Sequence, residues 1–418
     1  MGPIASLDAA RTAVGRLFGP ALDLASFTAH YYERRWLHVE RNDSAYFSSV
    51  YDVEAFENGL FTAARFAEHA IGLARSEKPP PAPSDLRRTA SKSRREDPRP
   101  RREGSSQPLD LRALAEAFES GCSLILNEAF AFTPSLNAFC AALERELGFV
   151  VRANVYFSPP NAQGFDLHHD THDTVILQIE GEKSWNVYEP QRTLPLADET
   201  APPQRSATPS AALKLRPGDT LYLPRGTPHE ARSGPARSLH VTLGWYQPRL
   251  ADILIRAIEE AARNTEELRR AVPPGWQHDA MVRQELQSTA GTLLASVARD
   301  GYVERALADV AADTVLDGRA AAAGHFGELD ALAALTQDTR VQLREDTPFE
   351  LRDRLFSLEL IVPGKRLTLP ASYGNAIQRL TEGPSSLRDL DPLLPLEDLE
   401  ALVKRLVLGG VARIVPRA

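Results

Sequence analysis

The chain has 418 residues, of which 43% are hydrophobic and 25% charged, the profile of a globular protein with two or three domains. No apolar run reaches the roughly 18 residues of a membrane span, and the first residues lack the pattern of a secretory signal. The net charge of -8 argues against bulk nucleic-acid binding, and two cysteines, Cys122 and Cys140, fit the reducing cytoplasm, so we predict a cytoplasmic protein without membrane contact.

Residues 1–108 predict an N-terminal helical region with a basic insertion. One helix is expected to end near Trp36, before a short strand over Leu37–Val39, and another to cover Phe47–Phe61. From about residue 76 to 107 the chain is rich in Pro, Ser and Arg, so it cannot bury enough apolar surface to offset its ordering entropy. We expect disorder there; the segment is either a solvated insertion or a contact for an acidic partner such as RNA.

Residues 109–248 predict the catalytic domain. Asp110 is a candidate cap for a first helix, and a second helix is expected over Ser135–Leu147. Short strands separated by Pro and Gly then run from Val150 to about Tyr246. Helices followed by such a series of strands indicate an α+β fold built on a double-stranded β-helix, the jelly roll of the cupins.

Residues 249–335 predict a helical region that begins with an amphipathic helix. Further helices are expected over Asp279–Arg299 and Tyr302–Ala311. Helices of this kind pack either against a second subunit or against their own barrel, and the pattern fits both. The apolar positions of the first helix recur at helical spacing and comprise Leu250, Ile253, Leu254, Ala257, Ile258 and Ala261.

Residues 336–418 predict a separate module that resembles a winged helix. Strand-like segments over 354–362 and 364–369 precede helices over Tyr373–Thr381 and Leu396–Leu408, a Gly-Gly turn and a terminal strand. From Arg340 onward there are 12 Lys and Arg against 11 Asp and Glu. A winged helix that binds duplex DNA is expected to be basic, so this module is better suited to a structural role or a protein contact.

The residues with the clearest chemistry are His168, His169 and Asp170. Alternate side chains of an extended chain share a face, so His168 and Asp170 point the same way and His169 points away. They supply two members of a 2-His-1-carboxylate triad, which leaves three open positions on iron(II). His229, behind a Pro-Gly-Asp turn, is the candidate third ligand. The same ligands could also hold a catalytic zinc ion.

Lys183 begins a strand after the turn at Gly181, where its charge could pair with the distal carboxylate of 2-oxoglutarate. Tyr156 and Asn154, which precede the metal ligands on a neighbouring strand, could hydrogen-bond the same acid. This anchor favours iron over zinc. We therefore expect Fe(II) as the metal, 2-oxoglutarate as the co-substrate and O2 as the oxidant.

Four phrases of the sequence resemble the JmjC-type ribosomal oxygenases, which are protein hydroxylases of the cupin superfamily that use iron(II) and 2-oxoglutarate. The phrases are NVYFSPPNAQGF, LQIEGEKSWNVYEP, PGDTLYLPRGTPHEA and SLHVTLGWYQ. The resemblance implies that Lys183 and Tyr156 bind 2-oxoglutarate and that the segment after Pro248 forms a homodimer. It also implies that iron is bound by His168, Asp170 and His229.

Two further histidines lie close to the predicted ligands. His172 stands in Thr-His-Asp, where the family pattern is more often acidic and apolar, and it either influences substrate choice or is an incidental polar residue. His240, on a late strand of the barrel, is expected to support the ligands rather than to bind the metal. The basic insertion also departs from the family pattern.

The resemblance implies hydroxylation of a protein or peptide side chain, at the β-carbon of histidine or arginine, with a ribosomal protein as the candidate substrate. The same chemistry could instead modify a peptide natural product or a free amino acid. A non-catalytic scaffold that binds protein or nucleic acid is the alternative from another class. More than half of the chain lies outside the barrel core, which favours an extended polypeptide substrate over a small molecule.

Overall fold

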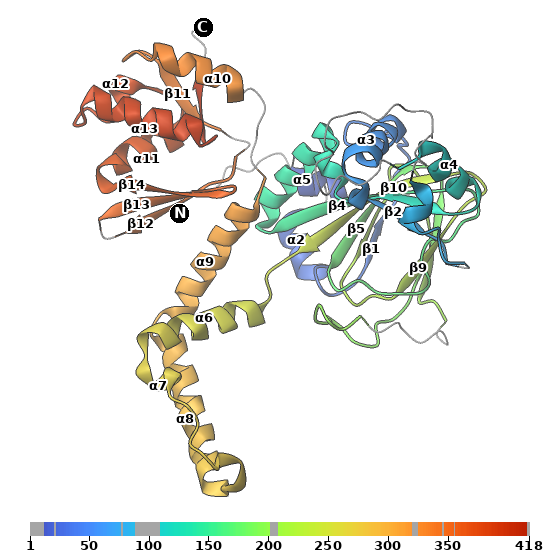
Figure 1. Ribbon diagram of the computed structural model, residues 1–418, viewed down its shortest axis with the longest axis horizontal. Helices are drawn as coiled ribbons and strands as arrows, with labels where there is room; N and C mark the ends of the chain where they lie inside the picture. The colour runs from blue at the N-terminus through green and yellow to red at the C-terminus, as the bar shows by residue number, and fades with distance from the viewer. Residues whose placement is uncertain are drawn as a thin grey trace, which may run out of the picture. The chain divides into compact units, whose positions relative to one another are not determined.

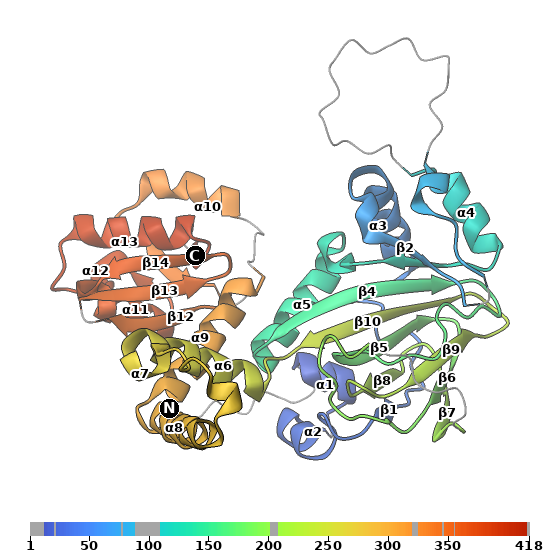
Figure 2. The same ribbon diagram turned by 60° about the horizontal axis from the view of Figure 1, so that its bottom comes forward.

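The computed structural model describes residues 12–20, 22–76, 78–87, 109–200, 208–319, 325–344, 347–354 and 356–415 (Figures 1 and 2). The chain forms two compact units. The first takes in the described residues up to Leu147 together with Val151–Tyr246, and the second takes in Gly148–Val150 and the residues from Gln247 onward. The boundary expected after residue 108 does not divide two units, because strands from both sides of it share one sheet.

The larger sheet of the first unit runs in the order β1-β8-β5-β10-β4-β3-β2 (Figure 2). Its edge strands β1 and β2 come from the N-terminal region, and β8, β5, β10 and β4 form its centre. The strands are β1 Leu37–Val39, β2 Ile71–Ala74, β3 Ser123–Leu126, β4 Val150–Ser158, β5 Asp173–Glu180, β8 Thr220–Leu223 and β10 Ser238–Tyr246.

The smaller sheet runs in the order β7-β6-β9, with β6 Lys183–Val187, β7 Ala211–Leu215 and β9 His229–Ser233. Apolar side chains of both sheets meet in one buried cluster: Ile176, Leu221 and Leu223 from the larger sheet, and Trp185, Val187 and Leu215 from the smaller. Two antiparallel sheets around a shared core are the jelly roll expected from the sequence.

Four helices of the first unit begin where a side chain caps the first turn. Asp110 accepts a hydrogen bond from the amide of Arg112 and caps its helix as expected. Asp52 caps α3, which therefore begins at Val53 rather than at Phe47. The expected helix end near Trp36 was also wrong, because α2 ends at His30. The helices are α1 Ala13–Phe18, α2 Leu24–His30, α3 Val53–Phe66, α4 Leu111–Glu119 and α5 Pro134–Leu147, with short 3-10 turns at Glu68–Ala70, Pro83–Leu86 and Ala129–Ala131.

The predicted basic insertion lies mostly outside the described residues, which omit 77 and 88–108. Its expected start near residue 76 was too early. The amide of Ser76 donates to the carbonyl of Gln163 at 3.0 Å, Leu86 is buried, and Arg87 pairs with Leu109. These contacts tie the segment before residue 88 to the first unit.

The turn at Gly218 joins the N-terminal segment to the barrel. Gly218 has a φ of 95°, and a Cβ atom placed there would lie 2.1 Å from the carbonyl oxygen of Asp43. Beside it, the carboxylate of Asp219 accepts hydrogen bonds from the amides of Arg41 at 2.6 Å and Arg216 at 2.8 Å. The turn needs glycine for both its backbone conformation and its close contact.

We expect Gly218→Ala to lower the free energy of unfolding of the first unit by at least about 2 kcal/mol, because strain in the left-handed region adds to a backbone clash. Gly121→Ala is the matched control. Its φ is 100°, but no atom lies within 4 Å of the added Cβ, so only the conformational cost of about 1 kcal/mol applies. Urea unfolding of both variants measures the difference, and equal losses would contradict the contact with Asp43.

The second unit begins with helices that pack against each other. Ile253, Ala257 and Ala261 are buried in a cluster with Val297 and Ala306. Leu250 and Leu254 of the predicted stripe are instead exposed. The expected single stripe is therefore divided between an internal core and the surface. The helices are α6 Leu250–Asn264, α7 Glu266–Arg269, α8 Ala280–Arg299 and α9 Tyr302–Asp317, with a 3-10 turn at Trp276–His278.

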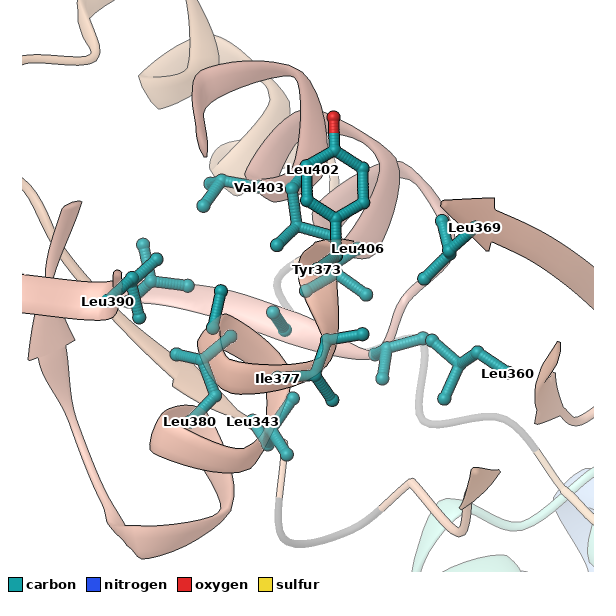
Figure 3. Packing of buried hydrophobic residues seen from close by; sticks show 14 of the residues in the cluster. Leu343, Leu360, Leu369, Tyr373, Ile377, Leu380, Leu390, Leu402, Val403 and Leu406 are labelled. Carbon is teal, nitrogen blue, oxygen red and sulfur yellow. The ribbon is translucent and has the colours of Figure 1, made fainter. Parts of the chain in front are cut away.

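The C-terminal part of this unit has its own hydrophobic core, in which Ile377, Leu380, Leu402 and Leu406 come together (Figure 3). The strand expected over 354–362 is in fact the end of one strand and the whole of the next, which pair antiparallel. The elements are α10 His325–Ala331, β11 Arg340–Leu343, β12 Glu350–Arg354, β13 Ser357–Val362, β14 Lys365–Pro370, α11 Gly374–Glu382, β15 Ser385–Ser386, α12 Leu387–Leu390, α13 Leu396–Leu408 and β16 Ala412–Val415, with 3-10 turns at Leu332–Ala334 and Ala371–Tyr373.

The strands of this part form the sheets β15-β11-β16 and β12-β13-β14. Within the described ranges, no helix has both the length and the apolar character needed to cross a membrane.

Candidate metal centre

The three residues predicted to bind a metal lie together in the first unit. His168 and Asp170 precede β5, and His229 is the first residue of β9. Paired backbone hydrogen bonds join the two histidines, at 3.2 Å from the amide of His168 and 2.8 Å from that of His229. One side-chain atom from each of the three lies within 4.8 Å of the others, and Nε2 of His229 is 3.8 Å from Oδ2 of Asp170. This spacing suits a single metal ion.

Hydrogen bonds fix which ring nitrogens face that ion. Nδ1 of His168 lies 2.8 Å from the carbonyl oxygen of Asp166, and Nδ1 of His229 lies 3.0 Å from that of Thr227. Because a carbonyl can only accept, both Nδ1 atoms carry the proton and both Nε2 atoms keep a free lone pair. Thr174 donates its hydroxyl to Oδ2 of Asp170 at 3.0 Å. Support of this kind orients metal ligands.

The local charges favour the protonation states that bind a metal. Burial by itself raises the pKa of the Asp170 carboxyl, but His229, His172, His168 and the Thr174 hydroxyl together hold it below its ordinary value. Burial, helped by the nearby His168, lowers the pKa of the His229 ring. An ionised carboxylate and a neutral imidazole are the forms that donate electron pairs to a cation.

The three residues open into a cavity of about 570 Å³, part of which is open to solvent. The cavity lies between the two sheets of the barrel and is lined by side chains from both. Besides the three candidate ligands, its lining comprises Ser123, Tyr156, Gly164, Phe165, Thr174, Ile176, Lys183, Trp185, Ala231, His240 and Thr242.

Lys183 is a buried cation in this cavity. Its side chain donates a hydrogen bond to the Ser158 hydroxyl at 3.3 Å, and Ser158 is 2.8 Å from the Ser123 hydroxyl. Among the described residues, no carboxylate lies within 4.0 Å of its ammonium nitrogen. Burial without a counter-charge lowers the pKa of Lys183 to about 7. Such a group favours the binding of an anion, which would restore its charge.

Of the other predicted site residues, Tyr156 and His240 line the cavity, whereas Asn154 and His172 do not. Tyr156 lines the cavity and stacks on His240, with ring centroids 4.9 Å apart. Burial and the nearby Asp170 raise the pKa of Tyr156. His240 also lines the cavity and is buried, whereas Asn154 does not line it. Asn154 accepts a hydrogen bond from the amide of Glu128 at 3.0 Å and interacts with the Tyr156 hydroxyl. His172 lies outside the lining and stacks on Tyr246.

Several cavity residues were not predicted from the sequence. Trp185, which lines the cavity, follows Lys183 by two positions on β6, and Ser158, which contacts Lys183 from behind the lining, follows Tyr156 by two on β4. Alternation along a strand was the signal that could have identified both. Ser123 and Phe165 come from β3 and a loop, and no local pattern connects them to the metal ligands.

The class of protein follows from comparison with known families. Residues 125–253, which hold the candidate ligands and most of the cavity lining, match the family model of the JmjC domain. Ribosomal oxygenase 1 from Rattus norvegicus is 30% identical over 340 residues, covering 78% of this chain and 50% of that protein. The bifunctional lysine-specific demethylase and histidyl-hydroxylase NO66 from Culex quinquefasciatus is 28% identical over 349 residues, covering 81% of this chain and 50% of that protein.

Solved structures show the same fold. The X-ray structure of E. coli ycfD has a TM-score of 0.53 with 15% sequence identity and covers 94% of this chain and 98% of that one. The resemblance stated from the sequence is confirmed: the chain carries a JmjC domain with a cupin fold and is related to the ribosomal oxygenases. It spans about half the length of the curated relatives that it matches.

Proposed function

We propose that this protein is an iron(II)- and 2-oxoglutarate-dependent dioxygenase that hydroxylates a side chain of a protein or peptide. The observation that carries the proposal is the buried Lys183 without a carboxylate partner, in the same cavity as the three candidate metal ligands. A buried cation close to an open metal site suits a dicarboxylate co-substrate, one carboxylate of which would pair with it.

The donor set fits the proposed metal and co-substrate. His168, Asp170 and His229 would hold iron(II) and leave positions for other ligands. Lys183 and the Tyr156 hydroxyl would hold the far carboxylate of 2-oxoglutarate, with the buried Ser158 supporting Lys183 from behind. When bound, the metal and co-substrate supply the oxidation by O2. The chain's own residues orient the reactants and exclude water, and the aromatic lining by Trp185, Tyr156 and Phe165 serves that purpose.

We propose a protein substrate because the relatives are named as ribosomal oxygenases and a histidyl-hydroxylase. The β-carbon of a histidine or arginine in a ribosomal protein is the candidate target. Modification of a free amino acid or a peptide natural product, and a non-catalytic scaffold, remain the alternatives. To decide, the enzyme is incubated with histidine- and arginine-centred peptides and with the free amino acids at matched concentration. We expect oxygen to be added to peptides alone, and comparable turnover of a free amino acid would refute the protein-substrate proposal.

We further propose a homodimer through α8. This helix spans Ala280–Arg299, yet Val297 is its one buried residue. Val282, Leu286 and Leu293 lie on the same face as Val297, at separations of four and seven residues, and are only partly covered. The helix projects from the α6–α9 pair in Figure 1. A second copy of the chain would cover this face, since symmetric dimers are the commonest oligomers.

The dimer proposal predicts that Leu286→Asp combined with Leu293→Asp gives a folded monomer, because two charges in the contact prevent association. Ile253→Asp should instead destabilise the helices, since Ile253 is buried between α6 and its neighbours. Sedimentation and circular dichroism separate the two results. A wild-type protein that is monomeric at micromolar concentration would contradict the proposal.

The C-terminal module supports a lesser proposal. Helices α11 to α13, the Gly409-Gly410 turn and β16 follow the order of a winged helix, and we assign the module a protein-contact role because its charge is nearly balanced. We also propose a cytoplasmic location, because the two buried cysteines of the first unit, Cys122 and Cys140, suit a reducing compartment.

A further inference from the structure

Beyond the cavity, the same face of the larger sheet continues along β10. His240 and Thr242 line the cavity, and Gly244 is the next position on their face because alternate residues of a strand share a face. The register pairs Gly244 with Thr174 of β5, which also lines the cavity. Gly244 is therefore the first residue on this face of β10 that lies beyond the cavity lining.

The ring of His172 fills the space over Gly244. A Cβ atom at Gly244 would lie 2.9 Å from both Cδ2 and Nε2 of that ring. Tyr246, the next residue on the same face, stacks against His172 with ring centroids 4.8 Å apart and planes at 16°. Glycine at 244 thus leaves room for His172, and Tyr246 holds it on the cavity side of the sheet, two residues from Asp170.

The nitrogens of this ring are free to bind a ligand. Within the described residues, neither ring nitrogen of His172 has a hydrogen-bond partner, and the residue is partly exposed. The neighbouring His169, by contrast, places Nε2 3.0 Å from the carbonyl oxygen of Glu199, and both candidate ligand histidines bond through Nδ1. The ring of His172 is positioned by packing against Gly244 and Tyr246 and by its charge interaction with Asp170, and its nitrogens make no hydrogen bond within the described residues.

We infer that His172 is a substrate-contacting residue, which Gly244 and Tyr246 position at the mouth of the metal cavity. Its imidazole forms a hydrogen bond with a peptide group of the polypeptide whose side chain enters the cavity. A peptide group offers both an N–H donor and a C=O acceptor, so either ring nitrogen finds a partner. This inference rests on the proposed function, because it requires a polypeptide substrate.

The test uses a synthetic library of peptides, each centred on one histidine or one arginine, and the full-length enzyme with iron(II) and 2-oxoglutarate. Two quantities are measured: oxygen added to peptide, as kcat/KM by mass spectrometry, and succinate formed without peptide. We expect His172→Ala and His172→Phe each to lower peptide hydroxylation about tenfold, because a peptide group loses its partner. Peptide-free succinate formation should fall far less than peptide hydroxylation, because His172 is not a candidate metal ligand and influences Asp170 only through its charge. His69→Ala, an exposed histidine on a distant 3-10 turn, is the matched control and should match the wild type in both.

Gly244 acts through His172, so its test is a double-mutant cycle. Gly244→Ala displaces the ring and should lower peptide hydroxylation as much as His172→Ala does, while adding Gly244→Ala to His172→Ala should cost nothing further. Additive losses would overturn the positioning role of Gly244.

The remaining outcomes distinguish a failure of the proposed His172 contact from a failure of the proposed dioxygenase function. Wild-type peptide hydroxylation in His172→Ala, or full activity in His172→Phe, would overturn the hydrogen bond from His172. A parallel fall in peptide-free succinate would also overturn it, since His172 would then act on the metal site. Succinate formation by the wild type with no peptide hydroxylated would exclude the peptide contact. No succinate from the wild type at all would refute the proposed function itself.

Discussion

Replacing Asp170 with alanine is expected to lower the rate at which 2-oxoglutarate is converted to succinate by more than about a hundredfold. Asp170 is the one anionic ligand of the candidate site, and its removal leaves two neutral imidazoles to hold a divalent cation. A bound metal stabilises the transition state by several kcal/mol, and this stabilisation is lost when the metal no longer binds. Iron binding, measured by calorimetry under anaerobic conditions, should weaken in parallel while the fold is retained.

His169→Ala provides the control for this prediction. His169 is adjacent in sequence, but its ring bonds to the carbonyl of Glu199 instead of facing the other ligands. It should therefore keep iron binding and activity. Thr174→Val should have an effect between those of Asp170→Ala and His169→Ala. We expect it to lower activity about 10- to 100-fold, because it removes the hydrogen bond that orients Asp170. Full activity of Asp170→Ala would refute the metal assignment.

Lys183→Ala is expected to raise the concentration of 2-oxoglutarate needed for half-maximal turnover by at least about thirtyfold, while iron binding changes little. Removing one partner of a buried charge pair costs roughly 2–5 kcal/mol, which sets this lower limit. Lys183 lies in the cavity but is not among the candidate ligands, so the two affinities should separate. An unchanged requirement for 2-oxoglutarate in this variant would place the anion site elsewhere.

The same residue predicts a pH dependence. Burial lowers the pKa of free Lys183 to about 7, so the charged form that binds a carboxylate is lost as the pH rises through 7. Binding of 2-oxoglutarate must then take up a proton, and its affinity should fall by up to about tenfold per pH unit above that value. Below pH 7 this contribution should be constant. Lys183→Arg stays charged throughout, and its affinity should show no such fall.

The sequence was most informative where chemistry and strand alternation coincide. His168 and Asp170 are two positions apart and do share a site, while His169 turns to another partner. The stripe of α6 was less informative, because spacing identifies an apolar face without telling what covers it. Ile253 is buried within the chain, whereas Leu254 is exposed.

Other features depended on contacts distant in sequence. Asn154 shares a face with Tyr156, yet it lies too far along β4 to line the cavity and instead bonds the amide of Glu128. Ser123 reaches Lys183 only through Ser158, a link that requires β3 to lie beside β4. The pairing of His172 with Tyr246 likewise depends on the register of β5 and β10, which a single sequence does not reveal.

The central claim is that the cavity around His168, Asp170 and His229 oxidises 2-oxoglutarate with iron(II). The most direct measurement is succinate formation by the purified full-length chain, supplied in turn with iron(II), zinc(II) or no metal. We predict succinate with iron(II) alone, and its loss when Asp170→Ala replaces the wild type. Succinate formation that is absent with iron(II), or that persists in Asp170→Ala, would contradict the account.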